Sequence, residues 1–169
     1  VIAQVIDFTG RVTGAPALAL LQIIVAAAPA ELWLMRQGAD RFVLKGGMAM
    51  RALYASARLT KDIDFDCEDS VSAQSMKAQM PKALEQAARA AGLVGIKVTQ
   101  TKAGDLASKW RLDAQLKSER PMTFDVEVSR RGVPGDGYVT TKTVQAPYEY
   151  RISPFVVRVY TPVAMAAGK

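Results

Sequence analysis

The sequence contains no histidine and a single cysteine, and these shortages exclude several classes of chemistry. Without histidine, Ser-His-Asp triads, histidine acid–base catalysis and ordinary zinc sites are ruled out. Cys67 has no partner for an intramolecular disulfide, which is typical of the reducing cytoplasm. We interpret Cys67 as a small core residue and predict a cytoplasmic protein.

The sequence also lacks an apolar run long enough to span a membrane. The longest candidate covers residues 16–28, whereas a spanning helix needs about 20 apolar residues. Upstream of it, Arg11 is offset by Asp7, so we do not expect a signal peptide. The run predicts a buried helix or, alternatively, a partner-binding helix, and no membrane association.

Acidic residues are outnumbered by basic ones, which gives a formal net charge of +6 over 169 residues. The basic excess lies between residues 77 and 151, and it favours an anionic partner, although basic charge can also serve only solubility. Half of the residues are apolar, so one domain can form a core without disulfide or metal support.

The most informative stretch is 42–66. The apolar run 42–44 predicts a buried strand, and Gly46-Gly47 precedes a helical pattern. Two glycines at a helix N-terminus allow the backbone to approach an anion such as a triphosphate closely. In the next strand, period-two alternation places Asp62, Asp64 and Asp66 on one face. Carboxylates beside a phosphate site predict Mg²⁺, with Asp62 and Asp64 as ligands.

A second strand of acidic character is predicted over 121–130. Asp125 and Glu127 share one of its faces, opposite the apolar Phe124 and Val126. A third carboxylate beside the first pair is what two-metal phosphoryl transfer requires.

The rest of the chain predicts an α/β (α+β) domain with a mixed sheet and flanking helices. A helix is expected over 70–91, kinked or divided at Pro81. The strands at 42–45, 61–67, 121–129 and 156–160 are predicted to be central, and a final helix begins at Thr161-Pro162. Further strands are expected over 93–101, 108–117 and 138–145.

Trp110 lies among basic residues on the predicted strand 108–117. We interpret it as a core residue, with base stacking as the alternative. Neutralising Lys109 and Arg111 is expected to weaken binding of an RNA acceptor, if RNA is the acceptor.

The combination of Gly46-Gly47 with Asp62-Ile63-Asp64 resembles the signature of polymerase-β-like nucleotidyltransferases. The string from Leu44 to Phe65 resembles the AbiEii/MenT-type nucleotidyltransferase toxins, in which LKGG is followed by a helix and then by Arg-x-(Ser/Thr)-x-Asp-h-Asp. The resemblance implies the polymerase-β-like fold and one nucleotidyltransferase domain over 1–169. The family's further helical part would follow residue 169.

The resemblance also implies roles for individual residues. Asp62, Asp64 and Asp125 would be the catalytic residues and metal ligands, Asp125 matching the family's third acid. Relatives often carry a basic residue two positions earlier, where this chain has Thr123. The nucleotide-binding residues would be Gly46, Gly47, Arg58, Thr60, Lys61 and Lys169.

The implied function is Mg²⁺-dependent transfer of an NMP from an NTP to a hydroxyl of tRNA, other RNA or protein. The protein would be a type IV-like toxin or phage-defence effector with a cognate antitoxin. Two alternatives stay open: a nucleotide- or partner-binding module without turnover, and an antibiotic-modifying nucleotidyltransferase, which the basic surface disfavours.

Overall fold

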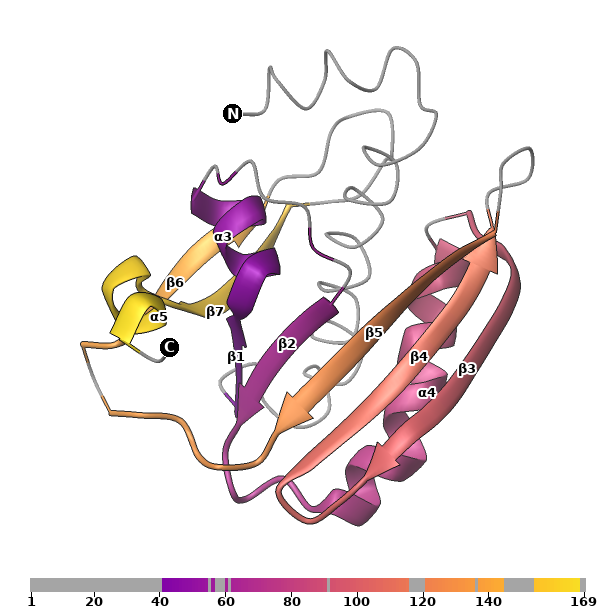
Figure 1. Cartoon of the computed structure of the whole chain (residues 1–169), viewed down its shortest axis with the longest axis horizontal. Helices are drawn as coiled ribbons and strands as arrows, with labels where there is room; N and C mark the ends of the chain where they lie inside the picture. The colour runs from indigo at the N-terminus through magenta and orange to yellow at the C-terminus, as the bar shows by residue number, and fades with distance from the viewer. Residues whose placement is uncertain are drawn as a thin grey trace, which may run out of the picture.

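Seven strands form one mixed sheet in the computed structural model, which describes residues 41–54, 56, 60, 62–90, 92–115, 121–135, 137–144 and 154–167 (Figure 1). The strands are β1 (Phe42–Lys45), β2 (Asp62–Cys67), β3 (Val94–Ala103), β4 (Ala107–Gln115), β5 (Met122–Ser129), β6 (Val139–Val144) and β7 (Phe155–Tyr160). Their order is β3-β4-β5-β2-β1-β7-β6. The four strands predicted to be central, β5, β2, β1 and β7, are indeed flanked on both sides.

The sheet is mixed because it contains both parallel and antiparallel strand pairs. β2 pairs in parallel with β5, and β1 in parallel with β7, whereas β1 and β2 are antiparallel. The outer pairs β3–β4, β4–β5 and β6–β7 are antiparallel. The β2–β5 register joins Asp62 to Asp125 and Asp64 to Glu127, so the two acidic strands lie side by side.

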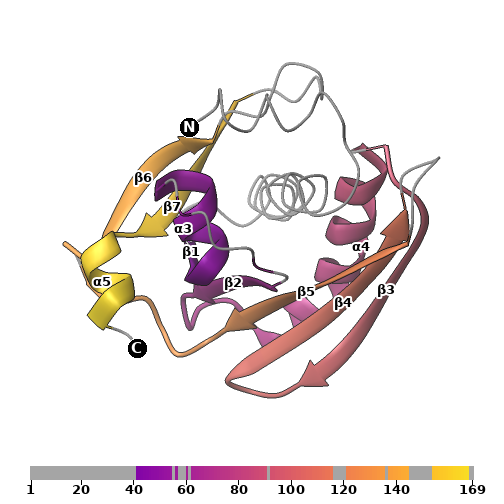
Figure 2. The ribbon, with the colours of Figure 1, turned by 45° about the horizontal axis from the view of Figure 1, so that its top comes forward.

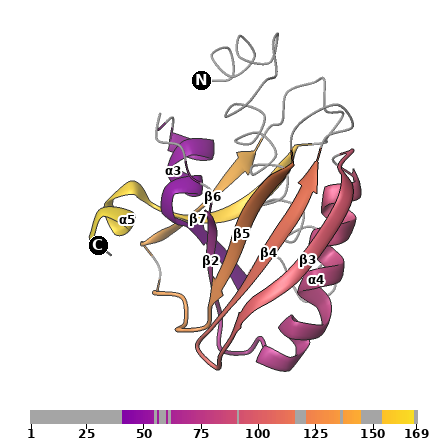
Figure 3. The same ribbon diagram turned by 45° about the vertical axis from the view of Figure 1, so that its right-hand side comes forward.

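Among the described residues, three helices accompany the sheet: α3 (Gly46–Tyr54), α4 (Ala73–Ala90) and α5 (Pro162–Ala167). α4 lies along β3 and β4, whereas α3 and α5 lie toward β1, β6 and β7 (Figure 2). In Figure 3, α4 is seen against one face of β3 and β4. None of the described helices meets the length and apolar composition needed to cross a membrane.

α4 runs through Pro81 as one helix, so the predicted division at this residue does not occur. It starts later than predicted because Ser72 caps it: the Ser72 hydroxyl accepts a hydrogen bond from the Ser75 amide at 3.1 Å. It ends at Ala90, and the φ of 78° at Gly92 allows the closing bonds from the Gly92 amide to the Arg89 carbonyl and from the Leu93 amide to the Ala88 carbonyl.

The core lies between the sheet and helices α3 and α4. Met76, Met80 and Leu84 of α4 are buried, as the helical spacing predicts, and Trp110 is fully buried among them. The core interpretation of Trp110 is therefore confirmed. Cys67 is also buried, and burial raises the pKa of its thiol to about 12, so it is an inert core residue. The predictions for residues 1–40, including 16–28, lie outside the described residues.

Candidate active site

The predicted glycine turn is where β1 passes into α3. Gly46 has a φ of 70°, a conformation that suits glycine, and a Cβ added there would lie 2.5 Å from Asp64 Oδ2. A Cβ on Gly47 would lie 3.1 Å from Thr60 Cβ and Oγ1. The glycine pair is thus pressed against Asp64 on one side and Thr60 on the other, at the N-terminus of a nine-residue helix.

Thr60 also holds the start of the acidic strand. Its hydroxyl donates to the Asp62 carbonyl at 3.2 Å and lies 3.3 Å from the Asp62 amide, which donates to it. The glycine turn and the start of β2 are more than a dozen residues apart in the sequence, but they are neighbours in space. The residues brought together are Gly46, Gly47, Thr60, Asp62 and Asp64. Arg58, Lys61 and Lys169 lie outside the described residues.

The alternation predicted for β2 is present. Ile63, Phe65 and Cys67 are buried, whereas Asp62, Asp64 and Asp66 occupy the opposite face. Burial raises the pKa of Asp64 to about 6, and the nearby charges of Asp62 and Glu127 add to that rise, against the opposing effect of Lys45 and Lys109. A nearby cation would therefore stabilise the ionised form of the Asp64 carboxylate.

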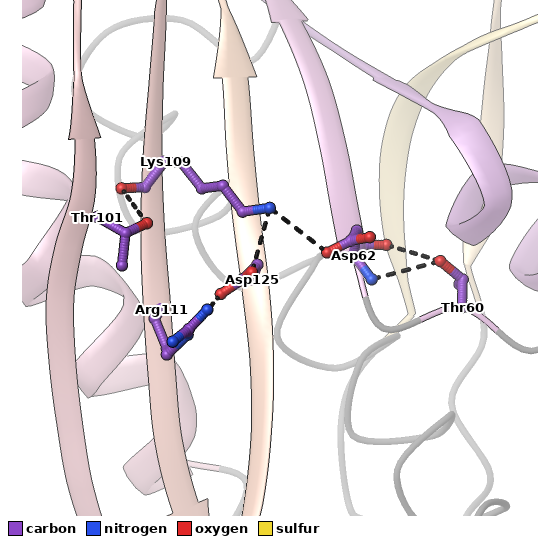
Figure 4. Close-up of polar contacts among 6 residues, drawn as sticks. All are labelled: Thr60, Asp62, Thr101, Lys109, Arg111 and Asp125. Atoms are coloured by element: carbon purple, nitrogen blue, oxygen red, sulfur yellow. Dashed lines mark hydrogen bonds and ion pairs between the residues drawn. The ribbon is translucent and has the colours of Figure 1, made fainter.

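Asp125 is paired with two cations from β4. Lys109 Nζ lies 3.1 Å from Asp125 Oδ2, and Arg111 Nε donates to Asp125 Oδ1 at 3.1 Å (Figure 4). Burial alone would raise the pKa of Asp125, but the hydrogen bonds and charges of Arg111 and Lys109 lower it overall. Asp125 is therefore ionised at neutral pH.

Lys109 also reaches Asp62, whose Oδ1 is 3.7 Å from its Nζ. Both cations, which were expected from the sequence to contribute to binding of an RNA acceptor, are thus paired with the acids of the site. Thr123 occupies the position where relatives often carry a basic residue. The threonine donates to Asp113, and the basic groups beside Asp125 come from the neighbouring strand.

Asp66, the last acidic residue of β2, has a different environment from Asp62 and Asp64. Asp66 forms an ion pair with Lys45 and accepts a hydrogen bond from the Tyr160 hydroxyl at 2.8 Å. Tyr54 in turn donates to the Tyr160 carbonyl at 3.0 Å. Asp66 is thus neutralised within a network that joins β1, β2, β7 and α3, and we assign it a structural role.

Asp62 and Asp64 provide a donor set that suits a divalent ion. Asp62 is half exposed, Asp64 follows it two residues later on the same face, and both offer hard oxygen ligands. Mg²⁺ commonly takes one or two carboxylates together with phosphate oxygens of the substrate, so Asp62 and Asp64 fit it. Within the described part of the chain, no three acidic or cysteine side chains are grouped closely enough to hold one ion between them.

Sequence reasoning missed Lys45 and Tyr160, and it missed that Lys109 and Arg111 belong to the site. Lys45 precedes the glycine pair directly and is the register partner of Asp64, so its position offered a signal. The cations of β4 offered none, because the sequence does not reveal that β4 lies beside β5.

The fold is shared with several solved structures. One crystal structure, of a nucleotidyltransferase from H. pylori, superposes with a TM-score of 0.63 at 18% identity, covering 92% of this chain and 58% of that one. JHP933 from Helicobacter pylori gives 0.60 at 17% identity, covering 98% and 55%. MenT4, a nucleotidyltransferase toxin from Mycobacterium tuberculosis H37Rv, gives 0.54 at 20% identity, covering 98% and 56%.

The sequence profile of the AbiEii family, described as the nucleotidyl transferase AbiEii toxin of a type IV toxin–antitoxin system, matches residues 33–169. The chain belongs to this family, which confirms the resemblance in the sequence, and the solved neighbours confirm the predicted fold class. No curated protein is similar enough in sequence to be called a relative. The chain spans somewhat more than half the length of the three solved proteins.

Proposed function

We propose that the protein is a Mg²⁺-dependent nucleotidyltransferase that moves an NMP from an NTP to a hydroxyl group. The observation that carries the proposal is the packing of the Gly46-Gly47 turn against Asp64, with Asp62 aligned to Asp125 across the β2–β5 pair. Family membership supports the same reaction class.

The glycine turn would bind the triphosphate. The first amides of α3 have no partner within the helix, and the absence of side chains at Gly46 and Gly47 lets phosphate oxygens approach them. Thr60 is next to this turn and could donate to a phosphate oxygen. We propose that Arg58, Lys61 and Lys169 also contact the nucleotide, as the family motif implies.

Asp62 and Asp64 would hold Mg²⁺, with Asp125 as the third ligand. When bound, Mg²⁺ would neutralise the phosphate charge that develops in transfer. Asp125 is ionised, so it can accept a hydrogen bond from the acceptor hydroxyl and orient its oxygen. That oxygen forms a bond to the α-phosphorus in line with the bond that breaks to release pyrophosphate, and the hydroxyl proton leaves to a base.

For the acceptor we propose RNA, with tRNA as the first candidate. On the sheet face that carries Asp62 and Asp125, β3 adds Lys97 and Lys102, and in Figure 1 no described helix covers this side of β3 and β4. Both lysines are exposed, and their register partners, Asp113 and Lys109, share the face of the acids. A phosphate backbone could follow this strip toward the site.

Replacing Lys97 and Lys102 by glutamine should weaken RNA binding while leaving nucleotide binding unchanged. Each lost phosphate contact should reduce the slope of log affinity against log salt by roughly 0.7 to 0.9. Fluorescence anisotropy with labelled tRNA between low and moderate salt measures this slope. The matched control replaces the exposed Lys77 and Lys82 of α4, which lies on the opposite face. Equal slopes in both double variants would remove the strip from the RNA path.

The reaction itself is tested by incubating the protein with each labelled NTP, Mg²⁺ and total tRNA, and then with cell lysate. Label in RNA or protein supports the proposal, and label in neither contradicts it. Binding of an NTP without transfer would favour the nucleotide-binding module, and transfer to an aminoglycoside would favour the antibiotic-modifying alternative. Because the family is that of type IV toxins, we also propose a cognate antitoxin as partner.

A further inference from the structure

The ammonium group of Lys109 lies between two carboxylates that the proposed reaction assigns to a metal ion. Its Nζ is 3.1 Å from Asp125 Oδ2 and 3.7 Å from Asp62 Oδ1, on strands whose register sets Asp62 opposite Asp125 (Figure 4). Two carboxylates in this position repel each other unless a positive charge joins them. In the metal-free protein, Lys109 supplies that charge.

The backbone of Lys109 is held in the sheet, whereas its ammonium group can move. Thr101 donates to the Lys109 carbonyl at 3.3 Å, and the β4–β5 register places Lys109 opposite Glu127. The side chain is 28% exposed, and four methylene groups carry the ammonium group, so it can turn to solvent without moving the strand.

The two carboxylates differ in what they lose when the ammonium group leaves. Asp125 keeps the hydrogen bond from Arg111, whose Nε is 3.1 Å from its Oδ1. Among the described residues, the only ion pair of the Asp62 side chain is with Lys109, and this side chain is 54% exposed. A metal ion can therefore displace the ammonium group more easily from Asp62 than from Asp125.

We propose that Lys109 is a positioning residue that acts as an internal counter-ion: it holds Asp62 and Asp125 together before metal binding and is displaced from Asp62 by the divalent ion. The inference rests on the proposed function, because it takes Asp62 as a metal ligand. It makes Lys109 a competitor of the metal, so this residue sets the metal concentration at which the site fills.

The test is Mn²⁺ binding without nucleotide, measured by electron paramagnetic resonance of free Mn²⁺. Lys109→Met keeps most of the stem and removes the charge, so it should bind Mn²⁺ about tenfold more tightly than the wild type. The matched control is Arg111→Gln, which removes a charge from the same face of the same strand; among the described residues, Arg111 is ion-paired with Asp125 but not with Asp62. It should change the affinity much less than Lys109→Met does.

Thermal unfolding provides a second measurement. Without metal, Lys109→Met should melt below the wild type, and added Mn²⁺ should raise its melting temperature by more than it raises that of the wild type. Asp62→Asn in either background should remove the tight Mn²⁺ site.

Equal Mn²⁺ affinity in Lys109→Met and the wild type, with the site still lost in Asp62→Asn, would overturn the role of Lys109 and leave the proposed function standing. Equal gains from Lys109→Met and Arg111→Gln would also overturn it, because the effect would then be one of net charge. If no variant binds Mn²⁺ through Asp62, this inference and the metal assignment of the proposed function both fail.

Discussion

Asp64→Asn is expected to abolish nucleotidyl transfer and, at pH 7, to stabilise the metal-free protein. Asparagine keeps the shape of the side chain beside Gly46 but removes a charge that burial, Asp62 and Glu127 all disfavour. Because Asp64 is partly accessible to solvent, we expect the free energy of unfolding to rise by only about 1 kcal/mol. Loss of activity together with a gain in stability is the mark of a group retained for function.

The same residue makes stability depend on pH. The pKa of Asp64 is about 6 in the folded protein, against an ordinary value of 3.8, so the folded state holds its proton more tightly than the unfolded state does. The stabilisation from this proton is complete below pH about 4 and is lost as the pH rises through about 6. Asp64→Asn should flatten this part of the profile.

Urea unfolding between pH 4 and 7 without divalent ions measures both effects, and transfer is assayed at saturating Mg²⁺. Asp113→Asn is the matched control, since Asp113 shares the sheet face but contacts Thr123 rather than the glycine turn. It should leave transfer intact. Full transfer by Asp64→Asn would disprove the assignment of Asp64 as a metal ligand.

Gly46→Ala should have the second large effect, on nucleotide binding. Its methyl group would lie 2.5 Å from Asp64 Oδ2, and its backbone has a φ of 70°, which costs a residue with a Cβ about 1 to 2 kcal/mol. Either Asp64 or the turn must move. We therefore expect NTP affinity to fall at least about tenfold and the protein to lose stability.

Gly47→Ala is the control for this change. Its methyl group would meet Thr60 at 3.1 Å, a contact that a small side-chain shift can relieve, and alanine favours the helix. Isothermal titration with a non-hydrolysable NTP and thermal unfolding would compare the two variants. If Gly47→Ala impairs binding as strongly as Gly46→Ala, the close approach of Gly46 to Asp64 is not what the site depends on.

Local sequence patterns predicted most of the helices and strands, and they predicted the acidic residues and the glycine pair of the site. The alternation of β2 and β5 placed Asp62, Asp64 and Asp125 on polar faces because a strand reverses its side chains at every residue. Gly46-Gly47 indicated the turn, because few residues other than glycine adopt the positive φ that is found at Gly46. Each of these signals is carried by a few consecutive residues, so the sequence displays it directly.

The cations of the site could not be predicted in the same way. Lys109 and Arg111 reach Asp125 only because β4 pairs with β5, and this pairing depends on the whole sheet. The division considered at Pro81 does not occur, because local helix rules leave out the burial of Met80 and Leu84 in the core, which supports one continuous α4.

The parallel pairing of β2 with β5 has a consequence for the order in which the protein assembles. The glycine turn and Asp64 come from neighbouring segments, so they can meet as soon as β1, α3 and β2 have formed. Asp125 joins them only after α4, β3 and β4 have been made and folded back, and such distant contacts form slowly. A growing chain would therefore possess a phosphate-binding turn well before it possesses a complete set of acids. The chemistry proposed for this family member would begin only after β2 has paired with β5, and not with the first contact between the turn and a nucleotide.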